Sequence, residues 1–170
     1  MRPLFVIGFM GAGKSTVGAI VARRLGRPFF DLDREIEREQ GMSVARLFAT
    51  MGESGFRDAE RTALAHAADI PGALIACGGG VVTDAGSHAI LRERGVVVYL
   101  KVSPEEAVAR VGADISGRPL LQGAVPGTAA ALLKSRERFY EAAADLVVDT
   151  ADREPAEIAD EVVTLVEGIE

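Results

Sequence analysis

A glycine-rich stretch near the start of the chain carries the residues best suited to chemistry. Gly8 to Ser15 read G-F-M-G-A-G-K-S, which fits the phosphate-binding pattern G-x-x-x-x-G-K-[S/T]. The glycines let the backbone curl until its N–H groups point at phosphate oxygens, and a following helix adds positive potential. Lys14 then reaches the β- and γ-phosphates, and Ser15 offers its hydroxyl to Mg²⁺. The stretch predicts a site for a nucleoside triphosphate, with ATP and magnesium as the expected pair.

The alternative is a glycine-rich turn that holds no ligand. The context favours binding, because the apolar run Leu4 to Ile7 predicts a strand before the loop and a helical pattern follows it. The chain also has only three lysines against 16 arginines. Composition therefore does not explain a lysine at position 14.

Two carboxylates follow the second predicted strand, at Asp31 and Asp33. On an extended chain, residues i and i+2 face the same way, so both carboxylates are expected to face one cleft. One would help to hold magnesium, and the other would orient or deprotonate an attacking hydroxyl. A helix cap at Asp33 is the alternative, because a helical stretch follows it.

Three consecutive glycines and four arginines complete the candidate set. Gly78 to Gly80 follow a buried strand, which fits either close approach of a ligand to the backbone or a tight turn. Arg57, Arg110, Arg118 and Arg136 can supply cations to a migrating phosphoryl group or grip a carboxylate. Taken singly, each arginine also fits a solvated surface.

Length, charge and cysteine usage narrow the class of protein. The 170 residues suit one domain. A net charge of -6 argues against a general nucleic-acid binder. Cys77 is the only cysteine, so no intrachain disulfide can form and a reducing compartment fits. No run has the length of a membrane span or the form of a signal peptide, so we expect a cytoplasmic protein, and its acidic composition favours a monomer.

Short apolar runs alternate with helical patterns along the chain. Strands are expected at 4–7, 29–31, 73–77, 96–100 and 146–148. Helices are expected over 14–25, over a short stretch capped by Ser43, over 84–94, after Ser103, up to about Ala144 and around 158–165, with a long loop at 112–127. This alternation predicts an α/β fold with a parallel sheet covered on both faces. In such sheets ligands bind beyond the carboxyl ends of the strands, where the glycine loop, Asp31 and the glycine triplet should converge.

The ordered set resembles the shikimate kinase family over nearly the whole chain. The residues that carry the likeness are Gly8 to Thr16, Asp31-Leu32-Asp33, Phe56-Arg57, Gly78 to Gly80, Arg118-Pro119-Leu120-Leu121, and Arg136 with Tyr140. The resemblance implies transfer of the ATP γ-phosphate to the 3-hydroxyl of shikimate, a step toward chorismate and the aromatic amino acids. It implies one domain over 1–170 with a nucleoside-monophosphate-kinase-like three-layer fold, a five-stranded parallel sheet of order 2-3-1-4-5 and a mobile lid at about 112–124.

The resemblance also assigns roles, position by position. The nucleotide residues would be Gly11, Ala12, Gly13, Lys14, Ser15, Thr16, Arg110, Arg118 and Arg153. The magnesium ligands would be Ser15 and Asp31. The catalytic residues would be Lys14, Asp33 and Arg118. The shikimate residues would be Asp33, Arg57, Gly79, Gly80 and Arg136.

Three other functions compete with this interpretation. A kinase of the same fold acting on another small molecule, such as gluconate, would share the glycine loop but not the whole set. A GTPase switch would need an Asn-Lys-x-Asp motif to bind guanine, and the chain has no asparagine. A degenerate domain kept for protein binding has no support, because every motif position is filled.

Overall fold

Five parallel strands form one sheet in the part of the chain that the structure describes, in the order β2-β3-β1-β4-β5. The structure is a computed structural model, and it describes residues 1–111 and 127–169. The strands are β1 (Leu4–Ile7), β2 (Phe29–Asp31), β3 (Leu74–Ala76), β4 (Val96–Lys101) and β5 (Leu146–Asp149). The expected sheet and its strand order are confirmed, and β3 is one residue shorter at each end than the sequence predicts.

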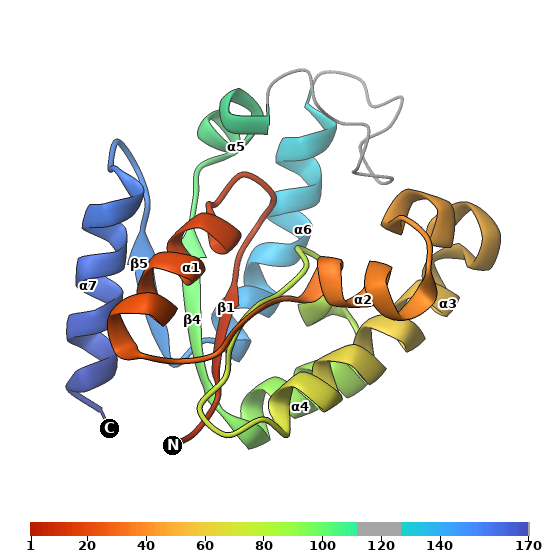
Figure 1. The fold of residues 1–170 in the computed structure, drawn as a ribbon. Helices are drawn as coiled ribbons and strands as arrows, with labels where there is room; N and C mark the ends of the chain where they lie inside the picture. Colours follow the sequence, from red (N-terminus) through yellow and green to blue (C-terminus); the bar gives the residue numbers. More distant parts are fainter. Residues whose placement is uncertain (112–126, 170) are drawn as a thin grey trace.

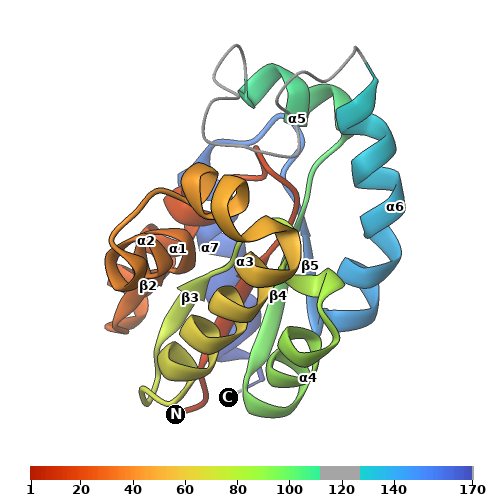
Figure 2. The ribbon, with the colours of Figure 1, turned by 90° about the vertical axis from the view of Figure 1, so that its right-hand side faces the viewer.

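Helices cover both faces of the sheet. They are α1 (Lys14–Leu25), α2 (Leu32–Gln40), α3 (Val44–Ala68), α4 (Ala85–Arg94), α5 (Pro104–Val111), α6 (Thr128–Ala143) and α7 (Pro155–Glu167), with a 3₁₀ turn η1 (Val81–Thr83). In Figures 1 and 2, α1 and α7 lie together on one face, while α3, α4 and α6 cover the other. The three-layer arrangement is therefore also confirmed.

The buried strands explain why the sheet forms. Every residue of β1 is buried, and so are the first five residues of β4. Such unalternating apolar runs suit central parallel strands that helices cover on both sides. Because the strands are parallel, their carboxyl ends meet at one edge. The glycine loop after β1 lies at this edge, and both termini lie at the opposite end of the molecule (Figure 1).

The helix that begins after Ser43 is longer than the sequence predicts. Ser43 caps it as expected, and its Oγ accepts a hydrogen bond of 3.2 Å from the backbone N–H of Arg46. The helix α3 then continues to Ala68, with a break at Gly52, where φ is +69° and ψ is -179°. This left-handed φ suits glycine and lets the chain change direction without ending the helix. The second segment of α3, after Gly52, carries Arg57.

Some predictions fall outside the described residues. They concern Arg118, most of the long loop at 112–127, and the lid at about 112–124. Within the parts of the chain that are described, the helices are too short or too polar to cross a bilayer.

Asp84 joins α4 to α3 and so helps to place the segment that follows the glycine triplet. Its carboxylate caps α4 by accepting from the backbone N–H of Ser87 at 2.8 Å. It also accepts two hydrogen bonds from Arg61 of α3, at 2.9 and 3.0 Å. Asp84 thus caps the helix expected over 84–94, and the same side chain couples two helices on one face of the sheet.

We expect Asp84→Ala to lower the free energy of unfolding by about 1 to 2 kcal/mol, because it removes a helix cap together with a charged partner. Urea denaturation measures this loss. Asp58→Ala is the matched control, since Asp58 also pairs with Arg61, at 2.6 Å, but caps no helix and its side chain is 67% exposed. Equal losses in the two variants would contradict the capping role.

Candidate active site

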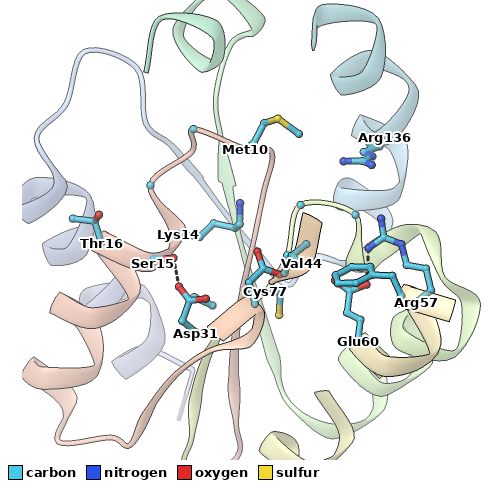
Figure 3. Close-up of a pocket in the computed structure, with 18 of the residues that line it drawn as sticks. Met10, Lys14, Ser15, Thr16, Asp31, Val44, Arg57, Glu60, Cys77 and Arg136 are labelled. Atoms are coloured by element: carbon cyan, nitrogen blue, oxygen red, sulfur yellow. Dashed lines mark hydrogen bonds and ion pairs between the residues drawn. The ribbon is translucent and has the colours of Figure 1, made fainter. Parts of the chain in front are cut away.

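A cleft of about 570 Å³ opens at the carboxyl edge of the sheet. It brings together twelve of the residues to which the resemblance assigns a role. They are Gly11, Gly13, Lys14, Ser15, Thr16, Asp31, Asp33, Arg57, Gly79, Gly80, Arg110 and Arg136. Figure 3 shows Ser15, Thr16 and Asp31 on one side of the cleft and Arg57, Glu60 and Arg136 on the other, with Lys14 between them. The prediction that these distant segments converge is confirmed.

The glycine loop has the backbone that a phosphate site needs. Gly13 adopts the left-handed conformation, with φ of +85°, immediately before α1 begins at Lys14. The side chain of Lys14 folds over the loop, and its Nζ donates to the carbonyl oxygen of Phe9 at 3.0 Å. Ala12, also expected at the nucleotide, is fully buried and does not line the cleft, unlike Gly11 and Gly13 on either side of it. The ammonium group and the start of α1 give this side of the cleft a positive potential.

Ser15 and Asp31 form a pair of oxygen donors beside the loop. The Ser15 hydroxyl donates to Oδ2 of Asp31, which joins the start of α1 to the end of β2 (Figure 3). Mg²⁺ prefers such hard oxygen ligands, and it typically takes one or two from the protein and the rest from phosphates and water. No group of three or more His, Cys, Asp or Glu side chains within the described ranges can hold a metal alone. The pair therefore fits magnesium that arrives with a triphosphate.

The argument from an extended chain is wrong for Asp31 and Asp33, although both line the cleft. Helix α2 begins at Leu32, directly after β2, so the two aspartates do not share a strand. Asp31 is the residue that caps α2, and its Oδ1 accepts from the backbone N–H of Arg34 at 3.3 Å. The capping role considered for Asp33 thus belongs to Asp31. Asp33 lies in the first helical turn and turns its carboxylate into the cleft.

The surroundings of Asp33 make it a stronger base than a free aspartate. Its carboxylate is open to the cleft, but the walls of the cleft displace much of its hydration. This desolvation raises the pKa of Asp33, and the nearby carboxylate of Asp31 raises it further. Lys14 and Arg57 act in the opposite direction, by attraction to the ionised form. Asp33 is thus suited to accept a proton from a hydroxyl group in the cleft.

The opposite wall contains a buried ion pair on α3. Arg57 Nη1 donates to Oε2 of Glu60 at 2.7 Å, one helical turn along. The Arg57 guanidinium also lies 5.3 Å from the ring centroid of Phe56 and 6.0 Å from that of Phe48. Glu60 holds Arg57 from one end while the rings pack against it. This pairing fixes the direction in which the guanidinium faces the cleft.

Sequence reasoning missed Glu60. The available signal was its spacing from Arg57, because residues i and i+3 lie side by side on a helix. Glu60 is fully buried, and its Oε1 has no hydrogen-bond partner among the described residues. A buried acceptor without a donor is costly, so this oxygen is suited to meet a hydroxyl or water in the cleft.

The glycine triplet makes room for this wall. A Cβ atom at Gly80 would lie 2.0 Å from Nη2 of Arg57, and one at Gly78 would lie 2.7 Å from Oε1 of Glu60. Neither substitution fits without displacing the ion pair. A Cβ at Gly79 would meet nothing closer than 3.6 Å. The close approach at Gly78 and Gly80 is therefore made by the protein's own side chains, which neither of the two alternatives from sequence included.

Helix α6 supplies another cation of the cleft, Arg136. Arg136 is only 4% exposed, and its Nη1 would lie 3.7 Å from a Cβ at Gly79. Tyr140, one turn further along α6, donates its hydroxyl to the carbonyl oxygen of Gly79. Burial raises the pKa of Tyr140 to about 12, so the phenol keeps the proton that this hydrogen bond needs. Tyr140 thus connects α6 to the glycine triplet, and Arg136 lies on the same side of the cleft as Arg57 (Figure 3).

Two of the three arginines expected near the nucleotide lie within the described residues, and they differ in position. Arg110 lines the cleft, and its Nη1 donates to the carbonyl oxygen of Gly11 in the glycine loop at 3.3 Å. Arg153 lies outside the cleft, where its guanidinium pairs with Glu161 at 2.6 Å and donates to the carbonyl oxygen of Asp149 at 2.9 Å. The nucleotide role of Arg153 stays a prediction, with its guanidinium held against α7 in this structure.

Comparison with known proteins decides the family. The sequence model described as shikimate kinase matches residues 10–167, which is nearly the whole chain. The chain belongs to the shikimate kinase family. A shikimate kinase from Moorella thermoacetica is 46% identical over 159 residues, which cover 94% of this chain and 91% of that protein. The family places the chain among small-molecule kinases, as the sequence predicts.

Solved structures of the shikimate kinase family agree with the fold. The shikimate kinase from Acinetobacter baumannii, solved in complex with shikimate, is 35% identical with a TM-score of 0.94, covering 100% of this chain and 95% of that one. A gluconokinase from Sinorhizobium meliloti has a TM-score of 0.64 over 99% of this chain and 93% of its own, but only 17% identity. That second likeness shows a shared fold alone.

Glu60 should make the stability of the protein depend on pH. Desolvation by burial raises its pKa from 4.5 to about 7, despite the attraction of Arg57. The folded protein therefore binds this proton more tightly than the unfolded chain does. The resulting stability is complete below the unfolded pKa and is lost as the pH rises through about 7.

Glu60→Gln cannot ionise and keeps a carbonyl acceptor for Arg57. Between about pH 5 and pH 8, we expect the wild type to lose about 2 to 3 kcal/mol of unfolding free energy relative to this variant. Urea denaturation across the pH range measures the difference. The control is Glu53→Gln, because Glu53 also pairs with Arg57 but its side chain is 54% exposed. A constant offset between the wild type and Glu60→Gln would contradict the raised pKa.

Proposed function

We propose that this protein transfers the γ-phosphoryl group of ATP to the 3-hydroxyl of shikimate, giving shikimate 3-phosphate and ADP. The observation that carries the proposal is a single cleft in which the glycine loop faces Asp33, Arg57 and Arg136. Shikimate is a small acid with several hydroxyl groups. A site for it needs a carboxylate that accepts a hydrogen bond from a substrate hydroxyl and cations that bind the substrate carboxylate. This cleft has both.

The donor half of the proposed site is the glycine loop and its neighbours. Backbone amides of Gly11 to Thr16 bind the triphosphate, and Lys14 leaves the Phe9 carbonyl to contact the β- and γ-phosphates. Ser15 and Asp31 hold Mg²⁺, which neutralises phosphate charge when it is bound. Arg118, which lies outside the described residues, contacts the migrating phosphoryl group in this proposal.

The acceptor half is the wall formed by α3, the glycine triplet and α6. Arg57 and Arg136 lie on the same side of the cleft and bind the carboxylate of shikimate, and the backbone of Gly79 and Gly80 contacts the substrate beside them. Arg57 reaches this position because Glu60 holds it at 2.7 Å. The two guanidinium groups thus hold the carboxylate end of shikimate, which lies away from the triphosphate.

The chemical step is a direct displacement at phosphorus. Asp33 accepts the proton of the 3-hydroxyl, whose oxygen forms a bond to the γ-phosphorus. The bond between the γ-phosphorus and the oxygen that bridges it to the β-phosphate breaks, and ADP leaves with that oxygen. Lys14 offsets negative charge on both phosphates as the bond breaks. The raised pKa of Asp33 suits this proton transfer, because a stronger base gains more from accepting the proton.

Other properties stay predictions from composition. They are action as a monomer in the cytoplasm, without nucleic-acid or membrane partners.

A substrate panel tests the proposed function. The protein with ATP and Mg²⁺ should release ADP with shikimate, and not with gluconate or with buffer alone. Lys14→Met should lower this turnover by about 100-fold or more, because the lysine charge acts on the transition state. Turnover with gluconate and not with shikimate would contradict the proposal that shikimate is the acceptor. Full turnover in Lys14→Met would remove the glycine loop from the mechanism.

Arg136→Ala tests the acceptor half separately. Loss of a hydrogen-bonded charge on the substrate carboxylate should raise the KM for shikimate by about 10- to 100-fold, with the KM for ATP little changed. Arg138→Ala is the matched control on the same helix, since Arg138 is exposed and lies over the ring of Phe139. Steady-state kinetics with each substrate varied in turn give both constants. Equal changes in both KM values would refute a role confined to shikimate.

A further inference from the structure

Thr150 is a fully buried polar residue immediately after β5. Its backbone N–H donates to the carbonyl oxygen of Lys101, at the end of β4, at 3.0 Å. Its hydroxyl donates to the same carbonyl oxygen at 2.9 Å. The backbone bond alone already connects the ends of the two strands, so strand pairing does not require the hydroxyl. Valine has nearly the same shape, so a threonine here needs another explanation.

The hydroxyl of Thr150 also accepts a hydrogen bond from Arg110. Arg110 Nη1 donates to Thr150 Oγ1 at 3.1 Å, and Nη2 donates to the Thr150 carbonyl oxygen at 2.8 Å. One residue therefore binds both terminal nitrogens of the guanidinium. A hydroxyl can donate to Lys101 and accept from Arg110 at once, which the side chain of valine cannot do.

The remaining bonds of Arg110 extend this contact to the glycine loop. Nη1 donates to the Gly11 carbonyl oxygen at 3.3 Å, and Nη2 donates to Oε1 of Glu106 at 3.4 Å. The same Glu106 oxygen accepts from the backbone N–H of Asp152 at 3.1 Å. The guanidinium thus connects the loop after β1, helix α5 and the segment after β5. Without an anchor, an arginine this exposed would sample many rotamers in water.

We propose that Thr150 is a positioning residue for the nucleotide, which holds Arg110 against the glycine loop at Gly11 and keeps its charge on the wall of the cleft. The inference rests on the proposed function, because it takes the loop to bind ATP. Thr150 itself does not line the cleft, so its effect on the nucleotide passes through Arg110. Removing the hydroxyl leaves Nη1 with only the longer bond to Gly11, and water can then draw the guanidinium away from the loop.

The test compares Thr150→Val with Thr150→Ser. Thr150→Val should raise the KM for ATP by about tenfold, as expected for one hydrogen bond to a charged group. The KM for shikimate and the melting temperature should change little. Thr150→Ser restores the hydroxyl and should return the KM for ATP to within about twofold of the wild type. Calorimetric titration with MgADP gives the same comparison without turnover.

A double-mutant cycle with Arg110→Ala isolates the proposed contact. If Thr150 acts through Arg110, Thr150→Val should add no further loss of MgADP affinity once the guanidinium is gone. Additive losses would overturn the inference, as would a fall in melting temperature with unchanged MgADP affinity or equal changes in both KM values. Loss of MgADP affinity in Thr150→Val, together with no shikimate turnover in the wild type, would uphold this inference and reject only the proposed acceptor.

Discussion

The acceptor wall of the cleft depends on the missing side chains at Gly78 and Gly80. The Arg57 guanidinium and the Glu60 carboxylate occupy the space that Cβ atoms at these positions would need, at 2.0 and 2.7 Å. Backbone and ion pair therefore lie closer together than any other residue type would allow. Tyr140 fixes the same triplet from the other side through the Gly79 carbonyl oxygen. The positions of Arg57 and Arg136 relative to each other follow from this one contact region.

Burial of Glu60 beside Asp33 adds an electrostatic constraint. A Cβ at Gly78 would lie within 3.1 Å of an oxygen of each carboxylate, so the two groups share a small region of the cleft. The Asp33 carboxylate raises the pKa of Glu60, and Arg57 lowers the pKa of both groups. Both line the cleft, but Asp33 is exposed whereas Glu60 is fully buried and paired with Arg57. This difference lets one carboxylate take part in proton transfer while the other holds an arginine.

Much of this fold could be predicted from local patterns. The five apolar runs predict strands whether or not their partners are known, and the glycine-loop motif predicts the conformation of its own backbone. The convergence of Lys14, Asp31 and Arg136 follows from the rule that parallel strands end at one edge. The length of α3 could not be read in this way, because a glycine such as Gly52 marks either a helix end or a kink. The orientation of Asp33 was predicted from the wrong geometry, since the chain enters helix α2 at Leu32 and does not stay extended to Asp33.

The residues that sequence reasoning missed share a physical cause. Glu60 and Thr150 are buried polar residues, and a local spacing such as that of Glu60 from Arg57 occurs equally between residues on a helix surface. Their hydrogen bonds also show that the two halves of the cleft are built differently. Side chains packed on α3 and α6 form the acceptor wall, whereas Arg110 joins backbone carbonyls of separate loops on the nucleotide side. Since the two networks share no hydrogen bond among the described residues, a change in one should reach the other substrate only through the reaction centre between Lys14 and Asp33.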